Sequence, residues 1–211
     1  MTVMRNDNAF TGLEAAIVLI AFVVVAAVFS YVVLGAGFFT TQKSQEVVHT
    51  GTQQASSSLE IIGNVYGAAT TANAENLAYV KFTVGNTAGG SALDMTKMVV
   101  SYIDDSISDV DVAYTSATGT ALIGDLEAKS ASVTTTGQTA GALSWGIIQQ
   151  FNGDHDTLLE PGEQFEIGVA VPSKSAVPNT PITVNLQPAV GAVFQLKRTV
   201  GPQIDLVNIL R

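Results

Sequence analysis

The chain has 211 residues, of which 47% are hydrophobic and only 13% are charged, about half the charged share of an ordinary soluble protein. Eighteen acidic and nine basic residues give a net charge of −9 without any basic cluster, which argues against nucleic acid as a partner. The absence of cysteine excludes disulfides, thiolate metal sites and cysteine nucleophiles.

A long apolar segment begins after Glu14. The 28 residues from Ala15 to Gln42 carry no charge, and a helix of about 20 apolar residues spans a bilayer. A secretory signal peptide is the simpler alternative, but its apolar core has at most about 15 residues and its first region is basic. Here the charge of Arg5 is offset by that of Asp7, and the acidic residue Glu14 immediately precedes the apolar run. We therefore predict a retained apolar helix.

Glu14 is an unusual residue for the start of such a helix. A charged side chain at mid-bilayer costs up to roughly 3 kcal/mol, and less near an end. This cost indicates a partner for the carboxylate, unless its side chain extends to the membrane interface.

The segment Ala9-Phe10-Thr11-Gly12-Leu13-Glu14, followed at once by the apolar helix, resembles the processing site of type IV pilin-like precursors. In that family a leader is removed before the first apolar residue. The resemblance implies a leader of residues 1–9, cleavage between Ala9 and Phe10, and an assembly role for Phe10 and Glu14. Two positions depart from the family pattern, because Ala9 replaces the usual Gly and Asn8 the usual Lys or Arg. Either Met1 or Met4 can be the start.

The helix is predicted to continue beyond the apolar block, from Phe10 to Ile62. Its later apolar positions recur every three or four residues, at Val48, Gly51, Ala55, Leu59 and Ile62. A helix of this length measures about 80 Å, which exceeds a bilayer core and calls for protein neighbours. Gly35 and Gly37 weaken it locally and favour a bend or a close helix approach. We assign residues 10–63 to this unit.

From Ala78 onward the apolar period changes to two, which predicts strands. Seven are expected, at residues 79–84, 97–103, 110–115, 145–151, 164–171, 182–186 and 193–200. Short strands in this number favour an immunoglobulin-like antiparallel β-sandwich, and hence an α+β protein. Residues 117–142 are rich in Thr, Ser, Gly and Ala and are expected to form a loop with a weak strand at 130–135. Residues 64–76 are assigned to a linker and residues 77–211 to the β-domain.

One acidic segment has the composition of a cation site. Asn152, Asp154, Asp156 and Glu160 place four oxygen donors within nine residues, as calcium loops do. The glycine position and the terminal spacing of an EF-hand are not met. We favour an acidic turn between strands and keep calcium, held by Asp154, Asp156 and Glu160, as the alternative. No catalytic or other cofactor motif occurs, so no enzyme is predicted.

With a pilin-like helix followed by a β-sandwich, the whole chain resembles archaellins, and the segment from Leu158 to Phe165 resembles the turn before a late strand in that family. The resemblance implies a structural subunit of the archaeal flagellum (archaellum), a helical homopolymer outside the cell that serves swimming. It also implies a precursor in the cytoplasmic membrane and, as partners, a preflagellin or prepilin-type signal peptidase, a membrane assembly platform and a motor. An adhesion pilin and a single-span membrane-anchored extracellular binding protein are the alternatives.

Overall fold

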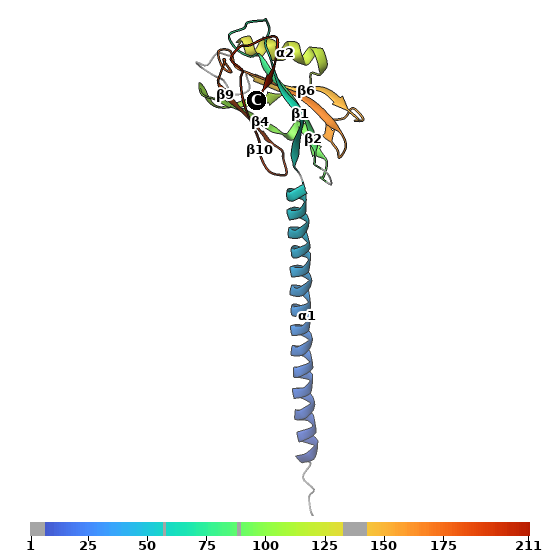
Figure 1. The fold of residues 1–211 in the computed structure, drawn as a ribbon. Coiled ribbons are helices and arrows are strands. Elements are labelled where there is room, and N and C mark those ends of the chain that lie inside the picture. The colour runs from blue at the N-terminus through green and yellow to red at the C-terminus, as the bar shows by residue number, and fades with distance from the viewer. Residues whose placement is uncertain (1–6, 57, 88–89, 133–142) are drawn as a thin grey trace, which may run out of the picture. The chain divides into compact units, whose positions relative to one another are not determined.

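The computed structural model describes residues 7–56, 58–87, 90–132 and 143–211. The chain falls into two compact units, Met1–Gly51 and Thr52–Arg211. The first contains most of a long helix, and the second contains the strands and a shorter helix (Figure 1). The predicted α+β architecture, a long apolar helix followed by a mostly antiparallel β-sheet domain, is thus confirmed.

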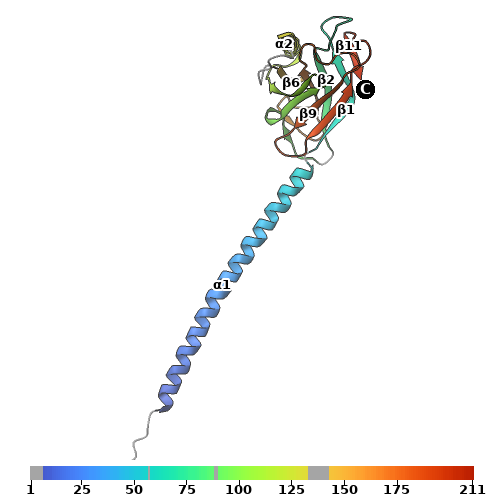
Figure 2. The same ribbon diagram turned by 90° about the vertical axis from the view of Figure 1, so that its left-hand side faces the viewer.

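Helix α1 (Asp7–Ser56) has 50 residues and is one unbroken helix (Figure 2). Its sequence contains no proline, and Gly35 and Gly37 lie inside it without ending it. The helix ends six residues before the predicted end at Ile62. Serines occupy positions 56–58, and serine competes with the helical backbone for hydrogen bonds, which favours an end there.

Strand β1 (Leu59–Ala68) occupies the segment that was predicted as the last helical turn and a linker. Its register with the next strand shifts between Ile62 and Tyr66, and Gly63 adopts a positive φ of 82° there. This bulge interrupts the alternation of apolar and polar residues along the strand, so the apolar period does not predict it. The predicted units 10–63, 64–76 and 77–211 are therefore wrong in their boundaries, because residues 59–68 belong to the β-domain.

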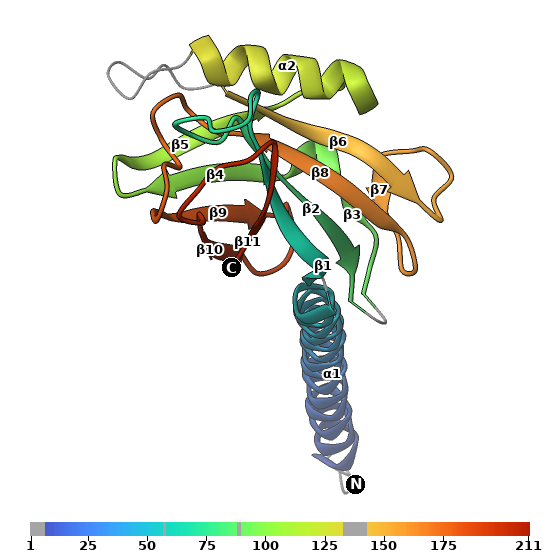
Figure 3. The ribbon, with the colours of Figure 1, turned by 45° about the horizontal axis from the view of Figure 1, so that its top comes forward.

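All seven predicted strands are present, with bounds shifted by up to three residues. Figure 3 labels helix α2 and the strands from β1 to β11. The elements are β2 (Tyr79–Asn86), β3 (Leu93–Asp94), the 3-10 turn η1 (Met95–Lys97), β4 (Val99–Asp104), β5 (Ile107–Tyr114), α2 (Gly119–Ser132), β6 (Leu143–Phe151), β7 (Leu158–Leu159), β8 (Gln164–Ala170), β9 (Pro181–Gln187), β10 (Phe194–Thr199) and β11 (Val207–Leu210). Strands β1, β3, β7 and β11 were not predicted.

Nine of the strands form one continuous sheet in the order β10-β9-β4-β5-β6-β8-β2-β1-β11, and β3 pairs with β7. Every neighbouring pair is antiparallel except β5 and β6. The edge strands β10 and β11 meet through backbone hydrogen bonds between Thr199 and Arg211. The β-domain is therefore built around a single nine-stranded sheet whose two edge strands are bridged at one residue pair.

Helix α2 corrects the prediction of a loop at residues 117–142 for residues 119–132, and residues 133–142 lie outside the described residues. It connects the parallel strands β5 and β6 and packs against β6 and β8 (Figure 3). Leu122 and Leu126, four residues apart on one helix face, are fully buried. The predicted weak strand at 130–135 begins inside α2, and its residues 133–135 lie outside the described residues.

Two paired glycines make room for α2. Gly146 and Gly168 are register partners on β6 and β8. A Cβ atom at Gly146 would lie 3.1 Å from the methyl groups of Leu122, and one at Gly168 would lie 2.7 Å from Cδ1 of Leu126. The helix can therefore approach the sheet closely only because both positions lack a side chain.

The core of the β-domain is apolar and dense. Its largest fully buried side chains are those of Trp145, Tyr102, Phe82, Phe165 and Leu77. Trp145 contacts Tyr114 edge to face, with the ring centroids 5.1 Å apart, a favoured aromatic geometry. Trp145 and Phe165 therefore belong to the core.

Candidate functional site

The apolar part of α1 is the largest unpartnered surface among the described residues. Every large apolar side chain from Leu13 to Val48 on this helix is between 52% and 79% exposed. Four consecutive residues are apolar, namely Ile17, Val18, Leu19 and Ile20. Since each residue of a helix is rotated by about 100° from the one before, these four cover the whole circumference. The helix is thus apolar on all sides rather than on one face, which is typical of a helix buried in lipid or in a bundle.

The helix from Gly12 to Gln54 is long and apolar enough to cross a membrane, with a mean hydropathy of 3.0 in its most apolar window. Its 43 residues extend over about 65 Å, whereas a bilayer core is about 30 Å thick. Lipid can cover less than half of this length. The remainder includes an apolar part up to Phe39 and a polar part that contains Lys43 and Glu46.

The polar side chains in the later part of α1 bond within the helix itself. The hydroxyl groups of Thr40, Thr41 and Thr50 donate to the carbonyl oxygens four residues earlier, at 2.8, 2.9 and 2.8 Å. Nζ of Lys43 lies 2.6 Å from Oε2 of Glu46. Since hydroxyl groups and charges are costly to bury without a partner, these bonds make the helix easier to cover with apolar neighbours.

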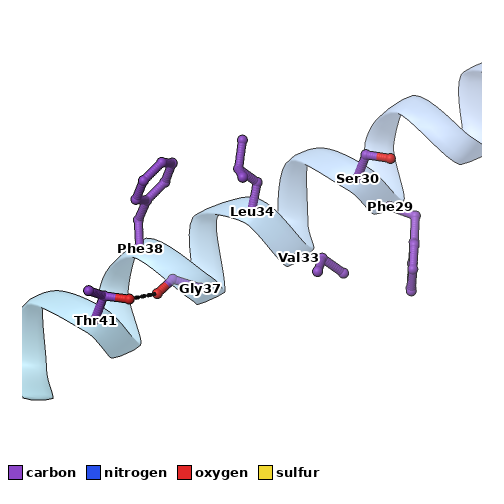
Figure 4. Close-up of a pocket in the computed structure, with 7 residues that line it drawn as sticks. All are labelled: Phe29, Ser30, Val33, Leu34, Gly37, Phe38 and Thr41. Carbon is purple, nitrogen blue, oxygen red and sulfur yellow. Dashed lines mark hydrogen bonds between the residues drawn. The ribbon is translucent and has the colours of Figure 1, made fainter.

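A groove runs along one face of α1 (Figure 4). We call it the Gly37 groove; it is open, has a volume of about 490 Å³, and is lined by Phe29, Ser30, Val33, Leu34, Gly37, Phe38 and Thr41. The hydroxyl group of Thr41 is turned back onto the Gly37 carbonyl oxygen. The sequence analysis noted Gly37 as a point of close approach but did not identify the aromatic residues on either side.

The predicted processing residues lie at the start of α1. Ala9 and Phe10 are helical, and Glu14 is exposed. Phe10 and Glu14 are four residues apart and so lie on the same side of the helix. The arrangement leaves the Glu14 carboxylate available to a group outside its own helix.

The structure does not bring the predicted calcium ligands together. Among the described residues, no three His, Asp or Glu side chains form a group that could hold a metal ion. Oδ1 of Asp154 accepts from the amide of Asp156 at 3.2 Å, and Oδ1 of Asp156 accepts from the amide of Leu158 at 2.7 Å. The amide of Glu160 donates to Oε2 of Glu163 at 3.0 Å. The bonds of Asp154 and Asp156 belong to an acidic turn between β6 and β7, and the bond between Glu160 and Glu163 belongs to the turn between β7 and β8.

A buried polar cluster in the β-domain escaped the sequence analysis. Asp104, at the end of β4, accepts from the hydroxyl groups of Tyr102 and Ser175 and from the amide of Ala176. Its other oxygen accepts from the amide and hydroxyl groups of Ser106, at 2.8 and 2.7 Å. The cluster ties β4 to the segment between β8 and β9, about 70 residues later in the chain. No local sequence signal indicates a contact over that separation.

Two opposing effects act on the acidity of Asp104. Burial raises the pKa of this carboxyl group, but the hydrogen bonds from Ser175, Ser106 and the Ala176 amide favour the ionised form, and the net pKa lies below the ordinary value. Burial also raises the pKa of Tyr102 well above its ordinary value. The tyrosine is therefore a neutral donor to an ionised carboxylate at neutral pH.

Comparisons with known proteins agree with this arrangement. The model of the archaeal-type flagellin family matches residues 9–198. "Probable flagellin 1" of Archaeoglobus fulgidus is 38% identical over 215 aligned positions, which cover 100% of this chain and 98% of that protein. The "24 kDa flagellin" sequence of Methanospirillum hungatei is 91% identical over 32 residues, 15% of this chain and all of that sequence.

A solved structure resembles the whole chain. "The archaeal flagellum of Methanospirillum hungatei strain JF1" superposes with a TM-score of 0.67 at 29% identity and covers 95% of this chain and 99% of that one. The family match, the full-length relative and this structure all include the apolar helix together with the β-domain. The chain belongs to the archaeal-type flagellin family.

Proposed function

We propose that this chain is the structural subunit of an archaeal flagellum filament, that it polymerises through α1, and that the filament serves swimming. The observation that carries the proposal is the apolar surface of α1, which is exposed on every side from Leu13 to Phe39, a length of about 40 Å that exceeds a bilayer core of about 30 Å. The similarity to a solved archaeal flagellum over 95% of the chain supports it.

Assembly would follow from a change of surroundings. The precursor sits in the cytoplasmic membrane, where lipid covers α1, and identical helices replace the lipid when subunits join the filament. Lipid and apolar protein are similar solvents, so helix association depends on close packing more than on the hydrophobic effect. Successive subunits meet through different faces, and such heterologous contacts extend into an open helical polymer outside the cell.

Leader removal would prepare the helix for this step. A preflagellin or prepilin-type signal peptidase cuts between Ala9 and Phe10, which creates a new ammonium group at Phe10. Glu14 of a neighbouring subunit then supplies the opposite charge. The ammonium group and the carboxylate are each costly to bury alone, and their pairing offsets this cost. A membrane assembly platform and a motor are the further partners.

An adhesion pilin or a single-span anchored protein would use the helix differently. An anchored protein needs only about 20 apolar residues, and the described helix from Gly12 to Gln54 is about twice that length. A static pilin would share the assembly but not the motor. The length of α1 therefore favours a filament subunit over an anchored protein. A motility assay then distinguishes an archaeal flagellum from an adhesion pilin.

The decisive experiment combines microscopy and mass spectrometry. Filaments sheared from cells that express this chain should be visible by electron microscopy, and their subunit should begin at Phe10. Deletion of the gene should abolish both filaments and swimming, and the unaltered gene should restore them. Filament subunits that still carry Arg5 or Asn8 would refute the processing site, and filaments without swimming would identify an adhesion pilin.

A further inference from the structure

The turn between β6 and β7 (Figure 3) contains the one Asn-Gly pair of the sequence, Asn152-Gly153. Asparagine is a thermolabile residue, because the backbone nitrogen of the next residue can attack its side-chain carbonyl carbon and close a five-membered ring. The next residue decides how easily this ring closes. Glycine has no Cβ and the widest choice of backbone conformations, so it hinders ring closure least.

Both reacting groups of this pair are free in the folded chain. Asn152 is exposed, and its side chain forms no hydrogen bond with any residue that the structure describes. The amide of Gly153 also donates to none of the described residues. The rest of the turn differs, because the carboxylates of Asp154 and Asp156 accept from the amides of Asp156 and Leu158. The Asn-Gly pair therefore lies just outside the hydrogen-bonded part of the turn.

We propose that Asn152 is a site of spontaneous deamidation through a cyclic imide. The Gly153 nitrogen forms a bond to Cγ of Asn152, the bond from Cγ to Nδ2 breaks, and the proton of the Gly153 amide leaves with that nitrogen as ammonia. Water then opens the ring. Attack of water at Cγ gives aspartate, and attack at the main-chain carbonyl carbon gives isoaspartate, in which the backbone runs through Cβ and Cγ.

Either product changes the turn. Both add one negative charge next to Asp154, and isoaspartate also lengthens the backbone by one carbon atom. Gly153 has little free space around it, since a Cβ atom placed there would lie 3.1 Å from Oε1 of the buried Glu163. The longer backbone of isoaspartate must therefore shift the turn against Glu163.

Asn179 is a matched control within the same chain. It is exposed and has a positive φ of 64°, against 57° for Asn152, and its side chain also lacks a hydrogen bond among the described residues. The β-branched Thr180 follows it, and the amide of Thr180 donates to the carbonyl oxygen of Val177 at 3.2 Å. The two asparagines therefore differ in the residue that would attack them.

The test incubates the purified full-length chain, folded in detergent at mildly alkaline pH, and follows both asparagines by peptide mapping. We expect Asn152 to be converted at least about tenfold faster than Asn179, because a reacting group that is held out of position loses at least that much in rate. Isoaspartate should be detected at residue 152 by methyl transfer from S-adenosylmethionine with an isoaspartyl methyltransferase. The assay uses unassembled chain, so its outcome is independent of filament formation.

Two glycine variants separate ring closure from a general effect of substitution. Gly153→Ala should slow the conversion of Asn152 to about the rate of Asn179, since a Cβ atom hinders the attacking nitrogen. Gly124→Ala should leave the rate unchanged, because Gly124 lies in α2 and a Cβ atom there has nothing within 4 Å. An unaltered rate in Gly153→Ala would exclude attack by the Gly153 nitrogen.

Three results in the unaltered chain would overturn the inference without any variant. Equal rates at Asn152 and Asn179 would show that the Asn-Gly pair has no special reactivity. Conversion of Asn152 only after unfolding in urea would show that the folded turn protects it. Aspartate without isoaspartate would show direct hydrolysis of the side chain rather than a cyclic imide.

Discussion

Thr199 and Arg211 exchange backbone hydrogen bonds in both directions. The amide of Thr199 donates to the Arg211 carbonyl oxygen at 2.6 Å, and the amide of Arg211 donates to the Thr199 carbonyl oxygen at 3.4 Å. Thr199 ends β10 and Arg211 follows β11, so this pair joins the two edges of the nine-stranded sheet.

Deletion of Arg211 should therefore destabilise the β-domain, whereas Arg211→Ala should not, since alanine keeps the backbone groups. Two hydrogen bonds at about 0.5–1.5 kcal/mol each predict a loss of about 1–3 kcal/mol for the deletion. Urea denaturation of both forms measures the difference. Equal stability of the two would show that the edges do not depend on this pair.

The position of β1 predicts where the β-domain can be separated from α1. A fragment of residues 58–211 should fold as a soluble β-rich monomer, because it keeps the pairing of β1 with β2 and β11. A fragment of residues 72–211 lacks β1, which leaves β11 without a strand partner and exposes one edge of β2, so it should aggregate or stay unfolded. Far-ultraviolet circular dichroism and size-exclusion chromatography distinguish them. A folded, monomeric 72–211 fragment would contradict the assigned role of β1.

Much of this fold could be predicted, and the failures have local causes. Strands such as β2 and β8 alternate cleanly and were found. β1 was missed because Leu59 and Ile62 also fit a helical spacing and the bulge at Gly63 interrupts its alternation. α2 was missed because its alanines, serines and glycine hide a two-leucine core contact. In that helix tertiary packing outweighs weak propensity.

The Asp104 cluster predicts a pH-dependent stability. Since the folded pKa of Asp104 lies below the ordinary carboxyl value, its contribution is complete above about pH 3.9 and is lost as the pH falls through the lower, folded value. Asp104→Asn in the 58–211 fragment should cost about 1.5–3 kcal/mol at pH 7, because hydrogen bonds to an ionised group are lost. The cost should shrink as the pH falls through the folded pKa of Asp104.

The neighbouring exposed residue Asp105 provides the control. Asp105→Asn should leave the free energy of unfolding within about 0.5 kcal/mol at every pH tested. Denaturation curves at pH 7 and at a series of acidic pH values test both variants. If Asp104→Asn and Asp105→Asn behave alike, the cluster does not stabilise the fold.

Glu14→Gln should still be processed but should polymerise poorly, since the new ammonium group of Phe10 would lose its partner. Glu46→Gln is the matched control on the same helix, because Glu46 pairs with Lys43 within its own subunit at an exposed position, where such pairs contribute little. Subunit mass and filament yield are the measurements. Normal filaments from Glu14→Gln would refute the charge pairing but not the processing site.

Calcium should not stabilise the β-domain. Asp154, Asp156 and Glu160 do not form a metal-binding group among the described residues. A site filled at 100 times its dissociation constant would add about 2.7 kcal/mol. The melting temperature of the 58–211 fragment should therefore be the same in calcium and in chelator. A melting temperature that is higher in calcium for the unaltered fragment but not for Asp156→Asn would support the metal site.

The candidate site was predictable only in part. The apolar helix, Phe10 and Glu14 are visible in the sequence because they depend on local composition and spacing. The Gly37 groove becomes visible only when the side chains around Gly37 are placed. The Asp104 cluster joins distant segments and has no local signature.

The place of β1 in the sheet has a mechanical consequence. Only two residues separate the end of α1 from Leu59, the first residue of β1, so a tensile or torsional load on the helix is passed on to the end of this strand. β1 is bonded to β2 on one side and to β11 on the other, and its ladder bonds run across the strand. A pull along the strand must shear both ladders together instead of opening one bond at a time. A rotating fibre would thus transmit its torque into a strand that is paired on both sides in each subunit.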